Sequence, residues 1–311
     1  MKKAFFFLLV YLCSVSAFQA QNFGIVASSI QTGGGGFTGI LDDVPGASIA
    51  IGTRKLDKDY TGSIIRIIRA SDSSEQDIGA SGEDIDEGAI NTFCSGTTCY
   101  VGIAYDQSGN SHDAYGKGYP TQTELPIIYE SGAIVKLNGK AAFKITHPRV
   151  FEWTEASASL SDFLTPGNSS TKAVTVHMVG QQSSSSGGAY KFIINSASDV
   201  LWCYESSSAE RTDFVATSAS SGTVFTDDAQ KEWIWRVSGG SHTWHENGTQ
   251  IASSTNNSTQ NTTQTNLTFN IGGLGFSTRN MEGYVQELIV WKPAETVATI
   301  FSNADTYYSI P

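Results

Sequence analysis

Apolar and polar residues alternate along several stretches in the second half of this chain. Every second residue is apolar from Val174 through Met178, within Ala173–Gly180. In Glu232–Val237 two tryptophans and a valine alternate with glutamate, isoleucine and arginine. A period of two residues indicates a β-strand with one buried face. Both stretches are therefore predicted to be strands, with their polar residues on the outer side.

Further β-rich stretches are separated by turn residues over the rest of the chain. Two asparagine-glycine pairs, Asn138-Gly139 and Asn247-Gly248, each lie between short strand-like runs, which is the strongest local signal for a hairpin. Ala47–Tyr60 fits either a strand or a short helix, and Asp72–Gly88 is acidic and rich in turn residues. The remaining predicted strands are Gly62–Arg69, Tyr100–Tyr105, Tyr190–Ile194, Val200–Tyr204, Leu267–Gly273 and Gly283–Trp291.

Only Ala294–Tyr308 shows a helical pattern, with apolar residues along one stripe. Many strands and one helix indicate an all-β, antiparallel fold. The order of a hairpin, the polar loop Ser253–Thr268, an Ile-Gly-Gly motif, the strand Gly283–Trp291 and a short helix resembles a concanavalin A-like jelly roll. In that fold two curved sheets pack face to face, and the concave sheet often holds a sugar.

The N-terminus has the pattern of a secretory signal. Lys2 and Lys3 precede the apolar run Ala4–Leu12, and a small-residue site ends at Ala17. The run is too short to span a bilayer, which argues against a membrane anchor. We therefore expect a signal peptide over 1–17, a Gly/Ser-rich leader over 18–38 and a single domain over 39–311, with parts 39–145 and 146–311. The expected location is outside the cell, in the periplasm or on the cell surface.

The charge excludes some classes of partner. The net charge is −11, and removal of 1–17, which holds two lysines and no acids, changes it to −13. Such a chain is not drawn to nucleic acid or anionic membranes by electrostatics. Neutral glycans, cations or other proteins are better candidates. Charged residues make up only 16% of the chain.

Three cysteines follow the signal. In an oxidising compartment the close pair Cys94 and Cys99 is the natural disulfide. A redox role is disfavoured because the spacing is not Cys-x-x-Cys, and zinc is disfavoured because no second ligand pair lies nearby. Cys203 lies in the apolar text LWCY and is expected to be a buried thiol.

No cofactor or metal is predicted. The loop Asp106–Asn110 offers oxygen ligands that could hold structural Ca²⁺, but Asx and glycine turns use the same residues, and the turn interpretation is favoured. His177, on the polar side of its strand, and His245, near a hairpin tip, are interpreted as ordinary surface histidines.

The stretch Thr92–Asn110 (TFCSGTTCYVGIAYDQSGN) resembles the catalytic domain of alpha-L-arabinofuranosidase B, a secreted retaining glycosidase. That domain has the same TFC-x-x-TTC, an apolar strand and YDQSGN. Similar residues occur upstream, including Thr53-Arg54, and downstream in Val135–Lys140. The likeness is specific over 42–143 and weaker towards the C-terminus. It implies that both parts of the chain form one β-sandwich.

Retaining glycosidases use two carboxylates about 5–5.5 Å apart, one a nucleophile and one an acid/base. The resemblance places the acid/base directly after Ile-Gly-Gly, where this chain has Leu274. The counterpart of the nucleophile, a glutamate in a tryptophan-rich strand, is Glu205 in LWCYESS. The family's adjacent cysteine pair beside the sugar pocket has no counterpart here. The catalytic signature is therefore incomplete, although the scaffold signature is strong.

Other residues remain candidates for the site. Among the alternative acids Asp199 and Glu287 are candidate binding residues, although the place of Glu287 in a common strand favours a structural role. Trp202 and Trp244 lie among polar residues and are expected to be exposed to a sugar, whereas most other tryptophans should be core. The further acids are Glu210 and Glu282.

Three hypotheses of function remain. The first is a secreted protein that binds arabinose-containing or related polysaccharide without an intact catalytic pair. The second is an active retaining alpha-L-arabinofuranosidase with a relocated acid/base. The third is a structural surface or virion adhesin. Leu274 and the missing cysteine pair favour the first hypothesis.

Overall fold

A computed structural model of the chain describes most of the residues from Gly36 onward. The chain divides into two compact units, Met1–Gly36 and Phe37–Pro311, and the fold described below is that of the second. The expected signal peptide and most of the expected leader lie outside the described residues and stay predictions. The described ranges are 36–146, 148–155, 173–183, 190–196, 201–206, 209–214, 218–220, 228–255, 267–271, 281–292 and 295–311.

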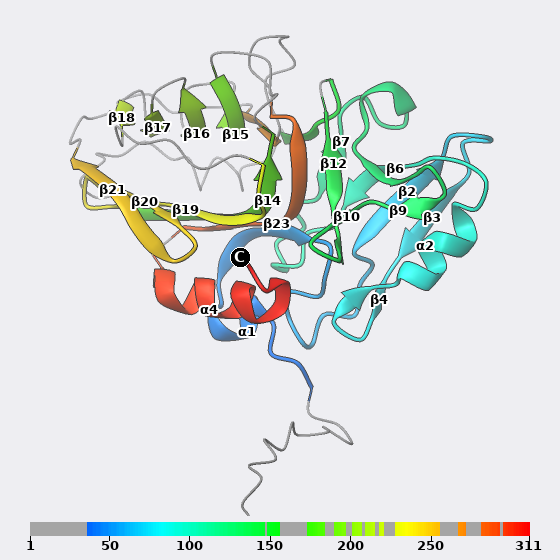
Figure 1. The fold of residues 1–311 in the computed structure, drawn as a ribbon, viewed down its shortest axis with the longest axis horizontal. Coiled ribbons are helices and arrows are strands. Elements are labelled where there is room, and N and C mark those ends of the chain that lie inside the picture. The colour runs from blue at the N-terminus through cyan, green and yellow to red at the C-terminus, as the bar shows by residue number, and fades with distance from the viewer. Residues whose placement is uncertain are drawn as a thin grey trace, which may run out of the picture. The chain divides into compact units, whose positions relative to one another are not determined.

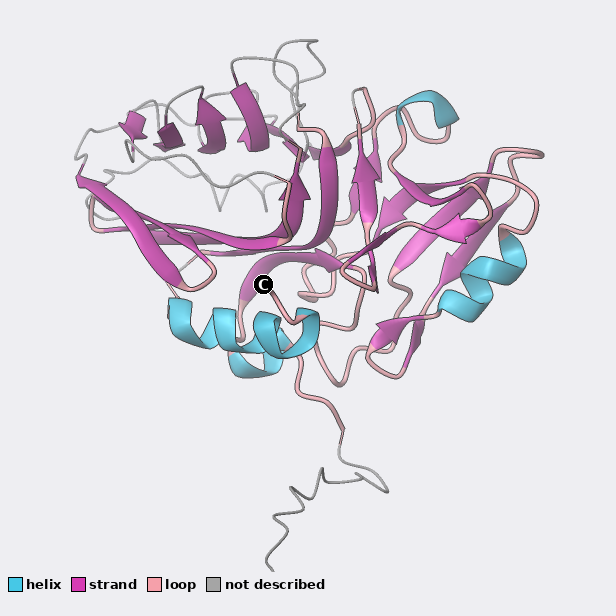
Figure 2. Cartoon of the chain, in the orientation of Figure 1, coloured by secondary structure: helices cyan, strands magenta, loops and turns pink. Residues whose placement is uncertain are grey.

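The large antiparallel sheet folds into two layers joined through β8, here called the first and second sheets, and the longest described strands lie in the first (Figures 1 and 2). Its strands pair in the order β1, β23, β14, β19, β20, β21, and β12 pairs with the beginning of β23 beside β1. The predicted strands β14 and β19 are confirmed, but the expectation that their polar residues lie on an exposed face is wrong, because His177 and Glu232 are fully buried. The bounds are β1 Ala47–Gly52, β12 Phe143–Ile145, β14 Ala173–Gln182, β19 Lys231–Ser238, β20 Ser241–Glu246, β21 Thr249–Thr255 and β23 Gly283–Trp291.

The second sheet runs from the N-terminal part of the chain into its middle. Its strands pair in the order β3, β2, β6, β7, β13, β22, β15, β16, β17, β18. The two parts of the chain thus share one sheet. The bounds are β2 Ile65–Arg69, β3 Glu75–Ile78, β6 Cys99–Ala104, β7 Ala114–Gly116, β13 Phe151–Glu155, β15 Tyr190–Ser196, β16 Leu201–Ser206, β17 Ala209–Phe214, β18 Ser218–Ser220 and β22 Leu267–Ile271.

Short elements join the sheets and close the turns. Strand β8 pairs with both β6 and β12 and so connects the two sheets. Asn138 and Gly139 both have positive φ, at 48° and 79°, and so do Asn247 and Gly248, at 48° and 71°, as the predicted hairpins require. The remaining strands and the 3₁₀ turn are β4 Ala80–Ser81, β5 Asp84–Ile85, β8 Ile127–Glu130, β9 Ala133–Ile134, β10 Lys136–Leu137, β11 Lys140–Ala141 and Gln122–Glu124.

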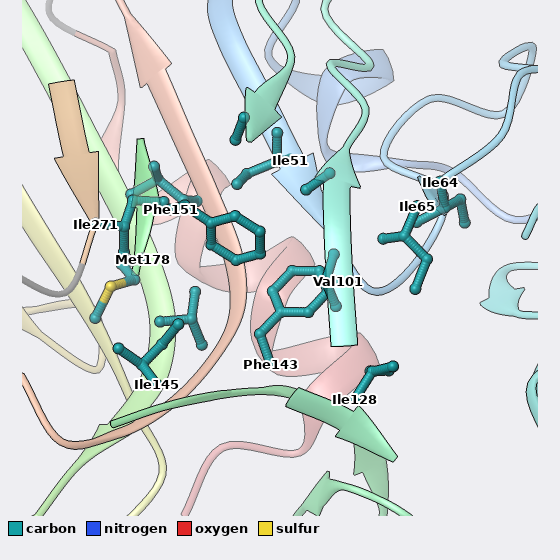
Figure 3. Close-up of a cluster of buried hydrophobic side chains, with 14 of the residues drawn as sticks. Ile51, Ile64, Ile65, Val101, Ile128, Phe143, Ile145, Phe151, Met178 and Ile271 are labelled. Atoms are coloured by element: carbon teal, nitrogen blue, oxygen red, sulfur yellow. The ribbon is translucent and has the colours of Figure 1, made fainter. Parts of the chain in front are cut away.

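The main core lies between the two sheets. Met178 from the first sheet and Ile271 from the second are both fully buried in it, as Figure 3 shows. Phe143 and Phe151 meet edge to face with their ring centroids 5.2 Å apart. Apolar contact between facing sheets is the arrangement of a β-sandwich. The predicted antiparallel sandwich with a C-terminal helix is confirmed.

A second apolar layer covers the outer face of the first sheet. Helices α1 (Ile40–Asp43) and α4 (Val297–Tyr308) lie against β1, β23, β14 and β19 (Figure 1). Ile234, Ile289 and Ile300 are fully buried in this layer. Both faces of the first sheet are therefore covered, one by the second sheet and one by helices.

Two helices were not predicted from the sequence. One is α1. The other is helix α2 (Glu87–Phe93), whose sequence has no long apolar stripe. Its N-terminus is capped by Asp86, whose Oδ1 accepts a hydrogen bond from the Ala89 amide at 2.9 Å. The expectation that Ala294–Tyr308 is the only helix is wrong, because a cap and tertiary packing support these short helices.

The end of the chain is held by both asparagine-glycine turns. The side-chain Nδ2 of Asn138 donates to the carbonyl oxygens of Tyr308 and Ser309, at 3.0 and 3.1 Å. The Asn247 amide nitrogen donates to the Pro311 carbonyl at 2.9 Å. These bonds satisfy carbonyls that follow the last turn of α4.

No helix among the described residues is long and apolar enough to cross a membrane.

Candidate functional site

Strand register brings the two motifs with expected catalytic roles to neighbouring parts of one sheet. Strand β22 ends at Ile271, opposite Ile194 in β15, and Ile194 is opposite Cys203 in β16. Neighbouring strands lie about 4.8 Å apart, so the Cα atoms of Ile271 and Cys203 are separated by about 10 Å. Ile271, the first residue of the Ile-Gly-Gly motif, is thus separated from β16 only by β15.

The side chains that would decide catalysis lie outside this description. Only the backbone positions of Trp202 and Glu205 in β16 are described, and Asp199 and Leu274 fall outside the described residues. Their expected roles stay predictions.

Glu205 nevertheless has an informative register. It lies directly opposite Glu210 of β17 in the antiparallel pair. Directly opposite residues share a face of the sheet, with Cβ atoms about 4.5–5.5 Å apart. The backbone therefore places two acidic residues directly opposite each other on neighbouring strands.

Trp244 does not have the exposure expected of a sugar-stacking residue. Its side chain is fully buried in the layer between the sheets, directly opposite Trp235 of β19. The expectation that Trp244 is exposed is wrong. Its adjacent polar residues, Thr243 and His245, point to the other side of β20, so they did not report on the surroundings of the indole.

His242, two residues before Trp244, is buried on the same side of β20. The two rings are stacked with centroids 6.3 Å apart, and neither ring nitrogen of His242 has a hydrogen-bond partner. Burial lowers the pKa of His242 to about 4 from an ordinary value of 6.5. The imidazole is therefore neutral in the folded chain near pH 7.

This depressed pKa predicts a loss of stability in mild acid. The unfolded chain takes up the His242 proton near pH 6.5, whereas the folded chain does so only near pH 4. The free energy of unfolding should therefore fall as the pH falls from 6.5 to 4, by up to roughly 3 kcal/mol. In a His242→Phe variant, urea unfolding at several pH values should show this part of the slope removed. Parallel curves for the two proteins would contradict the assignment.

His177 lies in a buried ionic network and not at the surface. Its side chain is fully buried, with Nε2 3.1 Å from Glu232 Oε1 and Nδ1 3.5 Å from Glu287 Oε1. The imidazole thus lies between two buried glutamate side chains, one on β19 and one on β23. The surface interpretation of His177 is wrong, as it is for His245, which is 7% exposed. The polar side of β14 is covered by α4 and not by water.

Arg54 connects this network to the helix α4. Its Nε donates to Glu287 Oε2 at 2.8 Å, and its Nη2 donates to Asn303 Oδ1 at 3.0 Å. The guanidinium lies over the ring of Tyr307, 4.5 Å from the centroid. Burial raises the pKa of Tyr308 well above its ordinary value, and this phenol donates to Glu287 Oε2 at 3.2 Å. Glu287 Oε2 thus accepts hydrogen bonds from both Arg54 and Tyr308, which fits a structural role, whereas its buried Oε1 has no hydrogen-bond partner. Ligand binding by Glu287 stays untested.

The loop Asp106–Asn110 is a turn that fixes the segment around Arg54. Asp106 Oδ1 accepts the Ala50 and Ser108 amides at 2.8 and 3.0 Å, and its Oδ2 accepts the His112 amide at 3.0 Å. The Gln107 side chain bonds the Arg54 carbonyl and the Leu56 amide. The turn interpretation is confirmed. The family-like residues of this loop hold the scaffold together.

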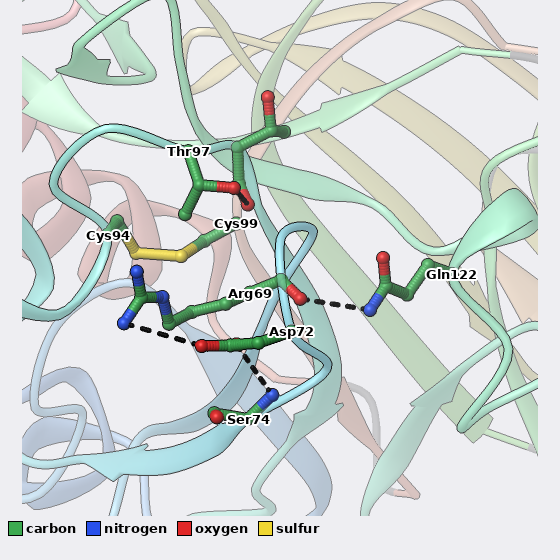
Figure 4. The surroundings of a disulfide bond; sticks show 8 residues. Arg69, Asp72, Ser74, Cys94, Thr97, Cys99 and Gln122 are labelled. Carbon is green, nitrogen blue, oxygen red and sulfur yellow. Dashed lines mark hydrogen bonds and ion pairs between the residues drawn. A yellow bond between two sulfur atoms is a disulfide. The ribbon is translucent and has the colours of Figure 1, made fainter.

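The predicted disulfide between Cys94 and Cys99 is also confirmed (Figure 4). It joins the end of α2 to the start of β6, with Cα atoms 5.8 Å apart. Arg69, close to the bridge, forms an ion pair with Asp72 at 3.7 Å. These contacts fix a loop and leave no sign of chemistry at the sulfurs.

A cluster of three aspartates near α1 is paired with a lysine side chain. Asp42, Asp57 and Asp59 come together near α1, and the Lys58 amino group lies 3.1 Å from Asp42 and 2.8 Å from Asp59. Each lysine contact neutralises negative charge that a cation would require. We assign no metal to this cluster.

A cavity of about 820 Å³ opens beside α4, away from the strand-end motifs, by which we mean Ile271-Gly272-Gly273 and the LWCYESS strand. Arg54, Glu83, Asn303 and Tyr307 are among its lining residues, and Arg54 already pairs with the other three. The cavity therefore exposes the edge of the buried network and does not contain Glu205.

Comparison with known proteins agrees with these scaffold motifs. The family model described as "Alpha-L-arabinofuranosidase B, catalytic" matches residues 42–269. The chain belongs to this family. Sequence similarity to curated members is concentrated in a short segment. Alpha-L-arabinofuranosidase B of Emericella nidulans is 36% identical over 102 residues, which are 30% of this chain and 20% of that protein. The Aspergillus niger enzyme is 32% identical over 112 residues, 33% of this chain and 22% of that protein.

The match thus spans about a fifth of the length of these curated arabinofuranosidases. Among solved structures, an arabinofuranosidase complexed with arabinofuranosyl-alpha-1,2-xylobiose has a TM-score of 0.61 at 16% identity, covering 86% of this chain and 63% of that chain. A GH54 arabinofuranosidase soaked with a cyclic sulfate inhibitor has the same TM-score at 15% identity, with the same coverage. This likeness shows that the arabinofuranosidase B fold is present here.

Proposed function

We propose that this arabinofuranosidase B-like protein binds arabinose-containing or related polysaccharide outside the cell, without an intact catalytic pair. One observation carries the proposal. The residue after Ile271-Gly272-Gly273 is Leu274, where the resemblance places an acid/base aspartate. A leucine side chain cannot give or take a proton, so the leaving group is not protonated from this position.

The scaffold supports the binding half of the proposal. The register places Ile271, the first residue of the Ile-Gly-Gly motif, with only β15 between it and the LWCYESS strand, which supports a retained sugar site. The disulfide between Cys94 and Cys99 fits an oxidising compartment, as the signal-like N-terminus does.

A second candidate is an active retaining glycosidase with a relocated acid/base. The register of Glu205 opposite Glu210 favours it. The spacing of such cross-strand pairs is close to the carboxylate separation of about 5–5.5 Å in retaining enzymes. In this candidate Glu210 replaces the missing aspartate.

Hydrolysis of 4-nitrophenyl alpha-L-arabinofuranoside separates the two candidates. Without an acid/base, the wild-type chain should release no nitrophenol above background, yet affinity electrophoresis should show its retardation by arabinan or arabinoxylan. Turnover that disappears in both Glu205→Gln and Glu210→Gln would replace the binding proposal with the second candidate. No retardation by any arabinose-containing polymer would remove the binding proposal.

A further inference from the structure

An aromatic patch lies on the outer side of the second sheet, on β7 and the segment that follows it. Tyr115 is 39% exposed, and among the described side chains it is the large hydrophobic residue that lies on the surface. Its ring centroid is 6.2 Å from that of Tyr119, with a tilt of 47°. Tyr115 also lies directly opposite Glu152 of β13. Two neighbouring rings thus face solvent beside a carboxylate-bearing residue.

The backbone beneath Tyr119 is shaped to seat its ring. A Cβ atom at Gly102 would come within 2.6 Å of the Tyr119 ring, so the ring occupies the space that a side chain would fill. The Tyr119 hydroxyl donates to Glu75 Oε2 at 3.0 Å. Its position is therefore fixed at both ends. A ring held in this way loses little rotamer freedom when a ligand binds.

Charged groups beside the rings are fixed as well. Arg66 Nε and Nη2 donate to the two carboxylate oxygens of Asp77, at 2.7 and 2.8 Å. The Tyr105 hydroxyl donates to Asp77 Oδ1 at 2.8 Å. The guanidinium hydrogen bond lowers the pKa of Asp77, which therefore stays ionised near pH 7. Planar hydrogen-bonding groups surround the aromatic patch on a rigid sheet.

The charge of this patch restricts its partner. One arginine stands against three acids, Glu75, Asp77 and Glu152, so the patch has no excess positive charge to attract phosphate or sulfate. The apolar area is broken up by polar groups, which disfavours a lipid surface. A sugar ring fits both components, because its apolar face stacks on tyrosine while its hydroxyls bond carboxylates and guanidinium.

We propose that Tyr115, Tyr119 and the Arg66–Asp77 pair form a second carbohydrate-binding surface, separate from the strand-end motifs, for the backbone of a neutral polysaccharide. The inference rests on the proposed function in that the partner is a polysaccharide. It differs in requiring no arabinose, because stacking on tyrosine recognises the face of any suitable sugar ring. Binding here would hold the polymer while its arabinose branches reach the other site.

Affinity electrophoresis of the full chain in gels containing wheat arabinoxylan or unsubstituted xylan tests this surface. Tyr115→Ala and Tyr119→Ala should each weaken retardation by both polymers at least fivefold. Tyr115→Phe keeps the ring and should bind as the wild type does. Thermal unfolding of each variant checks that the fold is intact. If Tyr119→Ala fails to fold, Tyr115→Ala decides the result, because its ring is the more exposed.

The outcomes separate the two proposals. Retardation of the wild type that is unchanged in Tyr115→Ala overturns the second surface and leaves the proposed function standing. Equal retardation by both polymers, lost in Tyr115→Ala, supports the second surface and counts against arabinose recognition. No retardation of the wild type by either polymer overturns the second surface, and the proposed function falls as well only if arabinan also fails to retard the chain. Loss in Tyr115→Phe equal to that in Tyr115→Ala contradicts stacking and therefore overturns this surface as described.

Discussion

A Leu274→Asp variant should hydrolyse 4-nitrophenyl alpha-L-arabinofuranoside at least about 100-fold faster than the wild type, because positioned acid/base catalysis contributes about 10²–10⁴-fold. The expectation follows from the Ile-Gly-Gly motif, after which the resemblance places the acid/base. It also follows from the register, which keeps that motif one strand from Glu205. Initial rates of nitrophenol release across a pH series measure the gain.

Matched variants test the reason for the gain. Leu274→Asn has nearly the same shape as the aspartate variant, but its amide does not ionise and cannot act as a general acid, so it should stay inactive. Addition of Glu205→Gln to Leu274→Asp should abolish the gain, because the nucleophile is removed. A folded Leu274→Asp protein with wild-type rates would show that this chain differs from a hydrolase by more than the missing acid.

Replacement of Arg54 with methionine should lower the free energy of unfolding by about 3–5 kcal/mol, the typical cost of breaking a buried ion pair. The substitution leaves Glu287 fully buried without its main cationic partner, and it removes the guanidinium contact with Asn303 of α4. Urea unfolding followed by tryptophan fluorescence measures the change.

An exposed arginine provides the control for this effect. Arg66 makes two equally short hydrogen bonds to Asp77, but both side chains are at least one-third exposed. Arg66→Met should therefore cost only about 1 kcal/mol or less. The double variant Arg54→Met/Glu287→Leu should recover part of the loss, since no buried charge of that pair remains. Equal costs for Arg54→Met and Arg66→Met would contradict the importance of burial.

Much of the fold could be predicted because local signals and tertiary structure agree. The asparagine-glycine pairs at 138–139 and 247–248 form the hairpins that their backbone preferences require. The alternation in Ala173–Gly180 and Glu232–Val237 gives neighbouring strands of one sheet. The TFC-x-x-TTC motif contains the disulfide.

The buried network could not be predicted because the alternation rule assumes water on one side of a strand. His177 and Glu232 alternate with apolar residues, as they would in a sheet with an exposed face. Here α4 covers that face, and nothing local to β14 reports a helix more than 100 residues later in the sequence. The one sequence signal for this network was Thr53-Arg54, which matches the family although no catalytic role is assigned to it.

The candidate catalytic residues present the opposite case. Glu205 and Leu274 were selected by resemblance, and only the strand register adds to what the sequence indicated. The register adds Glu210 as the cross-strand neighbour of Glu205, a pairing that required the β16–β17 alignment. The sequence alone could not align these strands, because a slip of one residue would have placed the two acids on different faces.

The bonds from Asn138 and Asn247 to the end of the chain also constrain the order of folding. They connect residues 170 and 64 positions apart in the sequence. Such distant contacts form only after the intervening chain has been organised, because loop closure is costly until both hairpins exist. During synthesis the sandwich therefore remains without its last contacts until residues 308–311 have left the ribosome.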